Sequence, residues 1–349
     1  MKKFYVTAVT ALLTAALAIF TITGCGPKKP RLFIYNWENY MPVEVIKEFE
    51  KRYGVRVIYD MFDSNEQMYT KLRSGGGRYD IVVPSADYAS ILISEGMVQE
   101  IDRTLIPNIK NIDPVMFELQ KRFDPEQKYS VIYAAGMSGV TVNTAHVGED
   151  FDRSWRIYDN DAFRNRMTLL DDMREVMGAA LRTLGYSVNS TSQEEIENAK
   201  NLVLEWRRNI VKFDVEAFGK GFAAGDFWVV QGYAENVFIE LNEAARETAV
   251  FFLPKEGGPM YMDNMMILKD ARNVELAHKF MNFIHEPQIY AKIMDYLETP
   301  SINVAARDYM EMETHYTIED MAKLGELKED LGPYLELYDR AWQEIRVGR

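Results

Sequence analysis

Two acidic residues, Asp172 and Glu175, stand three positions apart in the middle of the chain. This is the spacing of a capping box, in which the first side chain accepts from backbone amides at a helix start and the second reaches back. Two such carboxylates can also bind an ammonium group, because charge-assisted hydrogen bonds are about twice as strong as neutral ones. The two roles are compatible, so the spacing predicts a helix start and leaves a binding role open.

Residues that could carry catalysis or hold a metal form no known motif in this sequence. The four histidines include no metal-ligand pair at helical spacing, and no nucleophile motif stands out. The glycines at 75–77 lack the lysine and hydroxyl of a phosphate loop, and those at 219–225 have the wrong spacing for a dinucleotide site. We therefore expect a protein that is not an enzyme and that uses no metal and no cofactor.

The beginning of the chain has the order of a secretory signal. Two lysines precede the uncharged residues 4–23, and a glycine then precedes Cys25, the only cysteine in the sequence. We predict that residues 1–24 are a lipoprotein signal peptide, that Cys25 is lipidated, and that residues 25–30 tether the protein to a membrane in the periplasm. The alternative is a retained transmembrane helix, since about 20 apolar residues can span a bilayer.

Length and charge narrow the class of protein. A chain of 349 residues is longer than one hydrophobic core usually serves, which suggests two lobes. The formal net charge of −13 disfavours nucleic acid and favours cationic partners, although solubility alone also accounts for an acidic surface.

The first part of the chain alternates strands and helices. Helical spacing of apolar residues runs up to Gly54 and again up to the glycines at 75–77. The strands are expected at 32–35, 55–59 and 81–83. Alternation predicts parallel strands with helical crossovers, an open α/β sheet whose ligands lie beyond the carboxyl ends of its strands. Those ends carry Asn36, Trp37 and Ser85.

The remainder of the chain also contains both strands and helices. Strands are expected at 140–143, 168–170, 228–230, 249–253 and 265–268. Helices are expected at 194–212, 234–247, 273–285, 288–297, 318–330 and 333–346. A two-lobed α/β protein fits this order.

Several segments, taken in order, resemble the spermidine/putrescine-binding proteins of bacterial polyamine ABC importers. The resemblance runs from about residue 32 to residue 349, and the co-linear order of the segments carries it. The segments are Tyr35-Asn36-Trp37 with Tyr40, Ser64-Asn65-Glu66 with Met68-Tyr69, Tyr79-Asp80-Ile81-Val82-Val83-Pro84-Ser85, Asp171-Asp172 with Arg174-Glu175-Val176, Pro254-Lys255-Glu256-Gly257-Gly258, Met262-Asp263, and Asn303 with Ala305-Ala306-Arg307.

The resemblance implies a bilobed periplasmic-binding-protein fold of the two-crossover type, with two open α/β sheets and a ligand cleft between the lobes. It places residues 31–138 plus 257–303 in the N-terminal lobe and residues 139–256 plus 304–349 in the C-terminal lobe. Hinges would lie near 136–139 and 254–258. The lobes would close over the ligand by hinge motion.

The resemblance also implies a set of ligand-binding residues. A polyamine carries ammonium groups on an apolar chain, so carboxylates would pair its charges and aromatic rings would cover its methylenes. Asp172 and Glu175 would bind one end of the ligand, and Asp263 would bind another amine. The aromatic walls would be Trp37, Tyr40, Tyr233 and Tyr261, and Ser85 would offer a hydroxyl near one end.

Three positions depart from the common pattern of this family. Glu38 replaces a small hydroxyl residue, and Asp87 and Thr299 replace tyrosines. The first two changes add negative charge near the expected ligand end, so the preference between diamine and triamine is not carried over from the family. Each site residue also has an ordinary reading: Glu38 as a solvent-facing side chain, the aromatics as core or rim residues, and Asp263 as a solvated loop carboxylate.

Other functions remain open within the same fold. The chain could bind another small cation or an amino acid such as arginine, or serve as a surface sensor or adhesin. An amino acid would need an arginine for its α-carboxylate, and Arg174 lies within the acidic segment. The partners expected from the resemblance are a polyamine, an ABC permease in the inner membrane and the membrane itself, with no nucleic acid and the protein a monomer.

Overall fold

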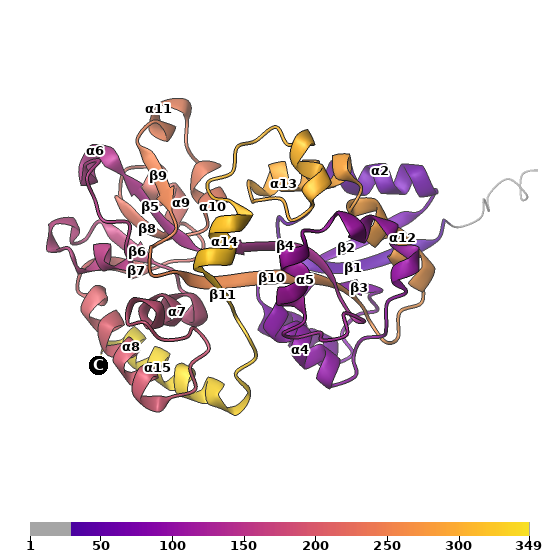
Figure 1. The fold of residues 1–349 in the computed structure, drawn as a ribbon, viewed down its shortest axis with the longest axis horizontal. Helices are drawn as coiled ribbons and strands as arrows, with labels where there is room; N and C mark the ends of the chain where they lie inside the picture. The colour runs from indigo at the N-terminus through magenta and orange to yellow at the C-terminus, as the bar shows by residue number, and fades with distance from the viewer. Residues whose placement is uncertain (1–28, 349) are drawn as a thin grey trace, which may run out of the picture.

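The fold is seen in a computed structural model that describes residues 29–348. The chain forms two lobes, each built around its own sheet, and long strands run from one lobe to the other (Figure 1). This confirms the predicted bilobed α/β architecture. The predicted signal peptide and Cys25 lie outside the described residues.

In the described part of the chain, the first sheet has six strands. Its order is β11-β10-β3-β1-β2, and β4 also pairs with β10. The strands are β1 (Arg31–Trp37), β2 (Arg56–Phe62), β3 (Ile81–Val82), β4 (Val131–Met137), β10 (Gly258–Ile267) and β11 (Gly325–Leu327). β1 is parallel to β2 and β3, as the alternation of elements predicted, whereas β10 runs antiparallel to β3 and β4.

Local sequence explains how the chain passes from the helix after β1 into β2. Helix α2 (Val43–Tyr53) buries Val45 and Phe49 and ends at Gly54, whose φ of 67° is left-handed. Glycine adopts that conformation without the steric cost that a side chain would bring. The chain can therefore reverse directly into β2 and place the carboxyl ends of β1 and β2 side by side.

The other helical elements of the first lobe surround its sheet. They are α3 (Asn65–Arg73), α4 (Ala86–Ser94), η1 (Arg103–Leu105), η2 (Pro107–Asn111), α5 (Pro114–Gln120), α12 (Val274–Ile284), α13 (Pro287–Leu297) and η5 (Val304–Tyr309). Helices α2, α12 and α13 contact one another, η5 packs against α13, and α4 packs against β10.

The second sheet has the order β7-β6-β8-β5-β9. Its strands are β5 (Gly139–Asn143), β6 (Met167–Leu169), β7 (Ile210–Phe213), β8 (Val229–Gly232) and β9 (Ala249–Phe252). The accompanying helices are α6 (Thr144–Val147), η3 (Trp155–Asp159), η4 (Asp161–Phe163), α7 (Met173–Thr183), α8 (Gln193–Arg207), α9 (Phe218–Ala223), α10 (Ala234–Phe238), α11 (Glu243–Arg246), η6 (Gly332–Tyr334) and α15 (Leu335–Val347). Helix α15 returns to this lobe and packs against α7 and α8.

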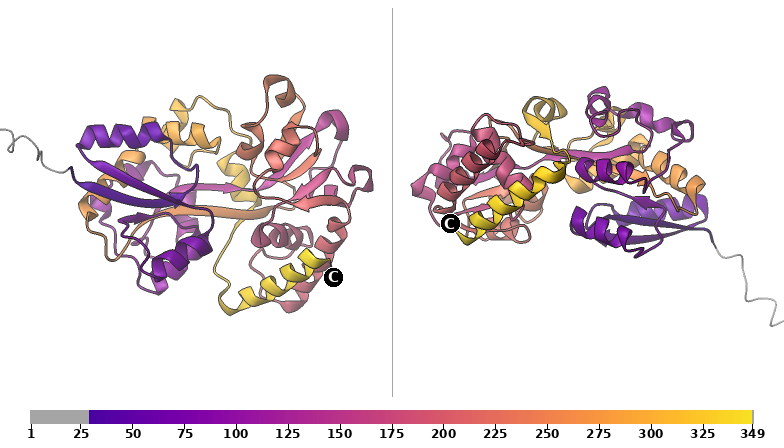
Figure 2. Two further views of the ribbon diagram at one scale, coloured as in Figure 1. Left: turned by 180° about the vertical axis from the view of Figure 1, so that it is seen from behind. Right: turned by 90° about the horizontal axis from the view of Figure 1, so that it is seen from below.

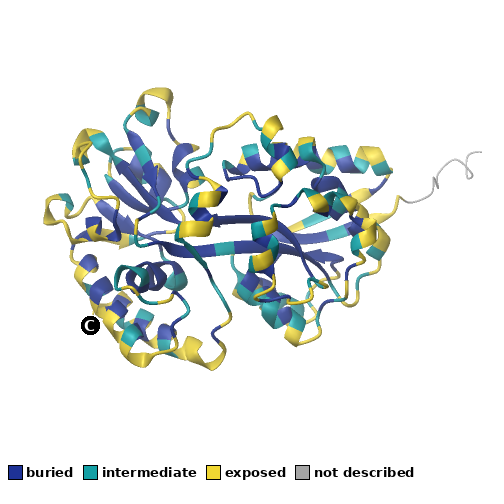
Figure 3. Ribbon diagram, viewed as in Figure 1, coloured by how far each residue is buried: buried dark blue, intermediate teal, exposed yellow. Residues whose placement is uncertain are grey.

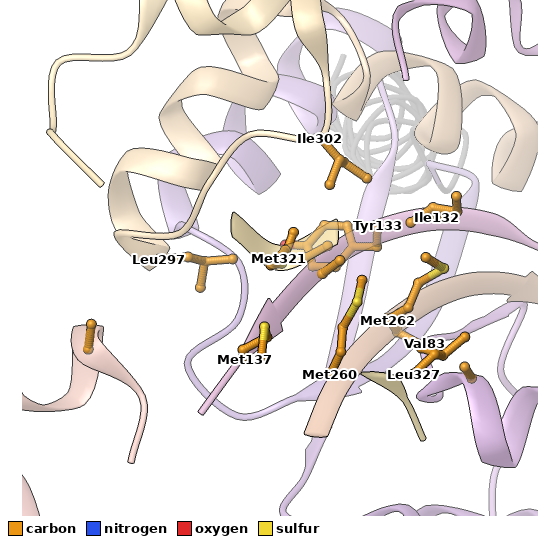
Figure 4. Packing of buried hydrophobic residues seen from close by; sticks show 14 of the residues in the cluster. Val83, Ile132, Tyr133, Met137, Met260, Met262, Leu297, Ile302, Met321 and Leu327 are labelled. Carbon is orange, nitrogen blue, oxygen red and sulfur yellow. The ribbon is translucent and has the colours of Figure 1, made fainter. Parts of the chain in front are cut away.

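Strands β4 and β10 join the two lobes, and both can be followed across the molecule in the views of Figure 2. The junction includes α14 (Ile318–Leu324), and its buried core is rich in methionine (Figure 4). The buried methionines there are Met137, Met260, Met262 and Met321. Methionine is flexible and fills irregular space, so it is a suitable residue for a core at the junction of two lobes.

Three predicted helices are wrong in extent. The helix expected at 194–212 ends at Arg207, and 210–213 is strand β7; the helix expected at 318–330 ends at Leu324 and gives way to β11. β7 pairs with β6, and β11 pairs with β10, so distant partners decide both strands. The helix expected at 234–247 is two helices, because Asn242 caps a new start by accepting from the amide of Ala245 at 2.9 Å. Strand β4 was not predicted.

The residues of the two sheets are mostly buried, whereas the outer faces of the helices are exposed (Figure 3). Within residues 29–348, no helix is both long enough and apolar enough to cross a membrane.

Candidate functional site

Asp263 lies on β10, where the first sheet reaches the junction of the lobes, and it is 4% exposed. Its Oδ2 accepts a hydrogen bond from the Tyr40 hydroxyl at 2.6 Å, and its Oδ1 accepts one from the Ser85 hydroxyl at 2.6 Å. Ser85 reaches it because an isolated antiparallel bridge between Ser85 and Asp263 extends the pairing of β3 with β10. Three residues predicted for the site thus meet, and we call Tyr40, Ser85 and Asp263 the Asp263 cluster.

Among residues 29–348, the hydrogen-bond donors to the Asp263 carboxylate are both neutral hydroxyls. Burial raises its pKa to about 6, against the opposing effect of the bonds from Ser85 and Tyr40. Burial and the Asp263 charge raise the pKa of Tyr40 well above its usual value, so this phenol stays protonated and donates. The negative charge is held in place without a bonded cation, which suits an incoming ammonium group.

Glu175 is completely buried on the first turn of α7. Its Oε2 accepts from the Ser138 hydroxyl at 2.6 Å, and its Oε1 accepts from the Lys328 ammonium at 2.5 Å. Asp172 caps α7 by accepting from the Glu175 amide at 3.0 Å, so the predicted cap is confirmed. The other half of the capping box, a contact from the Glu175 side chain back to the start of the helix, was predicted wrongly. Ser138 and Lys328 bind the Glu175 carboxylate instead. We call Ser138, Asp172, Glu175 and Lys328 the Glu175 cluster.

The two acidic departures from the family pattern lie in different surroundings. Asp87 is in the first turn of α4, and its Oδ1 is buried with no hydrogen-bond partner among residues 29–348. Burial raises the pKa of Asp87, while the charges of Lys328 and Arg174 act in the opposite direction. Glu38 is exposed just beyond β1, and the structure shows no contact between its carboxylate and either cluster. Asp87 is therefore close enough to the Lys328 charge to be affected by it. Glu38 faces solvent, which is the alternative to a ligand-binding role considered for it from the sequence.

Three of the predicted aromatic residues, Trp37, Tyr233 and Tyr261, pack against other aromatic rings. Tyr233 and Tyr261 meet edge to face with ring centroids 5.6 Å apart. Gly136 makes room for this arrangement, because a Cβ atom there would lie 2.4 Å from the Tyr261 hydroxyl. The rings of Trp37 and Phe62 pack together with centroids 4.7 Å apart, and the Trp37 indole Nε1 is buried without a hydrogen-bond partner among the described residues.

Sequence reasoning missed three polar residues of this region. Ser138 and Lys328 bind Glu175 but lie 37 and 153 positions from it, so no local pattern indicates them. Glu235, on α10, is the third: burial and, to a lesser degree, Glu298 raise its pKa to about 8. Thr299, the third departure from the family pattern, is buried just after α13.

The arrangement offers carboxylates, hydroxyls and aromatic rings at the junction of two lobes. Among residues 29–348, no group of three or more His, Cys, Asp or Glu side chains is placed to hold a metal ion. One hollow of about 330 Å³ lies elsewhere in the first lobe, lined by residues that include Phe33, Tyr79 and Arg272, and it shares no residue with either cluster. At the junction, the buried Asp263 carboxylate, which has no bonded cation among the described residues, is the feature best suited to a positively charged group.

Two α/β lobes joined by paired strands, with polar side chains between them, define a bilobed solute-binding architecture. Residues 44–317 match the family of bacterial extracellular solute-binding proteins, and the chain belongs to this family.

Named relatives agree with the resemblance seen in the sequence. The chain is 33% identical to the spermidine/putrescine-binding periplasmic protein of Escherichia coli K12, over 97% of this chain and 98% of that protein. Among solved structures it is similar to the TpPotD lipoprotein of Treponema pallidum, with 41% identity and a TM-score of 0.88 over 91% of this chain and 99% of that one. It is also similar to the spermidine/putrescine-binding protein PotD of Streptococcus pneumoniae, with 27% identity and a TM-score of 0.81 over 91% of this chain and 99% of that one. The predicted resemblance is confirmed.

Proposed function

We propose that this protein is the substrate-binding component of a polyamine ABC importer, which captures a polyamine between its lobes and delivers it to an inner-membrane permease. The observation that carries the proposal is the buried Asp263 carboxylate, held by two neutral donors from Tyr40 and Ser85. A buried carboxylate without a bonded cation is costly, and a ligand ammonium would offset that cost. The names of the relatives point to the same ligand class.

We place the ligand between the two clusters. One ammonium would bind Asp263, and Asp172 with Asp87 would attract another. Tyr233 and Tyr261 would cover the methylenes, since an aromatic face near a cation contributes roughly 0.5–2 kcal/mol. Trp37, whose indole nitrogen lacks a partner within the described part of the chain, would close one wall of the site.

Hinge closure would bring the two lobes together on the ligand. The proposed moving units are residues 31–138 plus 257–303 and residues 139–256 plus 304–349, with hinges near 136–139 and 254–258. Gly257 has a φ of 82° within the second hinge, a conformation that favours glycine. The methionine-rich core beside β4 and β10 is suited to such repacking. The η5 segment at 304–309 falls within the second of these units, but it packs on α13, so we propose that it moves with the first lobe and that the second unit resumes after it.

The proposed location is the periplasm, with the protein anchored to a membrane through Cys25 and acting as a monomer. The similarity to a treponemal lipoprotein supports the anchor. Labelling with radioactive palmitate tests this part of the proposal, and an unlabelled, freely soluble mature protein would contradict it.

The binding of an amino acid through its α-carboxylate is less well supported. Arg174 would be needed for that carboxylate, but its guanidinium donates to Asn189 at 2.8 Å and to the Glu329 carbonyl at 3.1 Å. It also lies over the Tyr338 ring at 5.6 Å. A ligand carboxylate would have to compete with these contacts, although the Arg174 Nε atom is buried without a hydrogen-bond partner among the described residues.

Calorimetric titration tests the proposal. The purified protein, stripped of bound ligand by unfolding and refolding, would be titrated with putrescine, spermidine, spermine and arginine. We expect one-to-one binding of at least one polyamine and no comparable binding of arginine. A folded protein that gives no heat with any polyamine, or that prefers arginine, would overturn the proposed function.

A further inference from the structure

An ammonium group from the chain itself already occupies part of the proposed ligand site. The Lys328 Nζ lies 2.5 Å from the Glu175 carboxylate, and the two side chains are 13% and 1% exposed. Burial alone would lower the pKa of Lys328, but Glu175, Asp172 and Asp87 raise it above its usual value, so it remains charged. A permanent cation therefore lies among the acidic residues that the family pattern assigns to the ligand.

The chain holds Lys328 firmly in this place. Its backbone amide donates to the Met260 carbonyl at 3.0 Å, which continues the register of β11 on β10. Asn189 fixes both flanks, because it donates to the Leu327 carbonyl at 2.8 Å and accepts from the Glu329 amide at 3.0 Å. These contacts fix the backbone from which the side chain extends, and rotating the ammonium away would leave the buried Glu175 carboxylate without its cation.

Glu175 therefore has little to offer a second cation. Each of its oxygens accepts one short hydrogen bond, from Ser138 and from Lys328. A ligand ammonium brought to the same carboxylate would lie beside the Lys328 charge, and like charges at such distances repel strongly when they are shielded from water. The acids left for a ligand are Asp263, Asp172 and Asp87.

We propose that Lys328 is a specificity-determining residue whose ammonium takes the place at Glu175 that a ligand amine would otherwise take. The site then accepts a ligand with one fewer positive charge at this end, which means a diamine in preference to a triamine. The inference rests on the proposed polyamine function.

The test compares putrescine and spermidine by calorimetry on the wild-type protein and on Lys328→Gln. Glutamine keeps a hydrogen-bond donor for Glu175 but removes the charge. We expect the wild type to bind putrescine more tightly than spermidine, and Lys328→Gln to strengthen spermidine binding by roughly tenfold or more with a smaller change for putrescine. The control is Lys323→Gln, which removes an exposed lysine on α14 and should leave both affinities unchanged.

The outcomes separate this inference from the proposed function. A folded wild type that binds neither ligand would overturn the proposed function, and this inference with it. Polyamine binding with the same preference in wild type and Lys328→Gln would overturn the inference alone. If Lys328→Gln fails to fold, the wild-type rank order still decides, because tighter binding of spermidine than of putrescine contradicts an internal ammonium at this site.

Discussion

The two acidic clusters at the lobe junction neutralise their carboxylates differently. Asp263 is held by two neutral hydroxyls, whereas Glu175 is held by one hydroxyl and one ammonium. Both carboxylates are buried, so both need compensation. The Glu175 cluster supplies its own cation, and the Asp263 cluster does not. This difference supports our proposals that Asp263 would anchor a ligand charge and that Glu175, through its pairing with Lys328, would influence which ligand fits.

The change with the largest expected effect removes the internal ion pair. Glu175→Gln would remove the carboxylate that is hydrogen-bonded to the buried Lys328 ammonium, and breaking a buried pair from one side costs about 3 kcal/mol or more. We expect the free energy of unfolding, measured by urea denaturation without ligand, to fall by about that amount. Glu275→Gln is the matched control, because Glu275 pairs with Lys279 on an exposed helix face and should matter little. Equal stability of the two variants would contradict a structural pair at Glu175.

The corresponding change in the Asp263 cluster should act on binding. Asp263→Asn removes the charge expected to meet a ligand amine, and losing one partner of a desolvated charge pair costs about 2–5 kcal/mol. We expect polyamine affinity measured by calorimetry to fall at least thirtyfold, on the order of 2 kcal/mol. Asp270→Asn, at an exposed position just after β10, serves as the control. An affinity within a few fold of wild type would place the ligand elsewhere.

The same cluster predicts a pH dependence of binding. Asp263 has a pKa raised to about 6, with Tyr40, Ser85, Lys328 and Asp87 as the groups acting on it. Its carboxylate must be ionised to attract an ammonium, so affinity should be full above pH 7 and should fall as the pH drops through 6. Polyamines stay protonated over this range, and one pH unit below the pKa corresponds to roughly tenfold weaker binding. Titrations between pH 5 and 8 would show this, and a flat profile would argue against Asp263 as the anchor.

A smaller effect should come from one of the two neutral donors. Ser85→Ala removes a hydrogen bond that lowers the pKa of Asp263, so the acid limb of the binding profile should move to higher pH. The expected shift is under about one pH unit, since a single hydrogen bond contributes about 1 kcal/mol. Ser94→Ala, at the end of α4, removes only a bond to the Ile91 carbonyl and should leave the profile in place. A shift to lower pH would contradict the role given to Ser85.

Much of the scaffold followed from local sequence. Gly54 ends α2 where the apolar spacing stops, and Asp172 caps α7 as its spacing to Glu175 predicted. These features depend on residues a few positions apart, and the backbone chemistry that decides them is local. The α/β alternation and the parallel pairing of β1 with β2 and β3 were predictable for the same reason.

The wrong predictions of secondary structure have a non-local cause. The residues of β7 and β11 continue helical patterns, yet they form strands because distant strands offer them hydrogen bonds. Burial outweighs intrinsic preference in such cases, and a single sequence does not reveal the partner. Lys328 was overlooked as a site residue for this reason: nothing near it in the chain marks it as a partner of Glu175.

The sequence by itself determined the class of fold, the family resemblance, the start of α7 and the candidate carboxylates and aromatic residues. Only the tertiary structure decided how those carboxylates are neutralised. Ser85 meets Asp263 across 178 positions, and Lys328 meets Glu175 across 153. The electrostatics of a buried site depend on such contacts, because a charge shielded from water is governed by the groups that touch it and not by its neighbours in the chain.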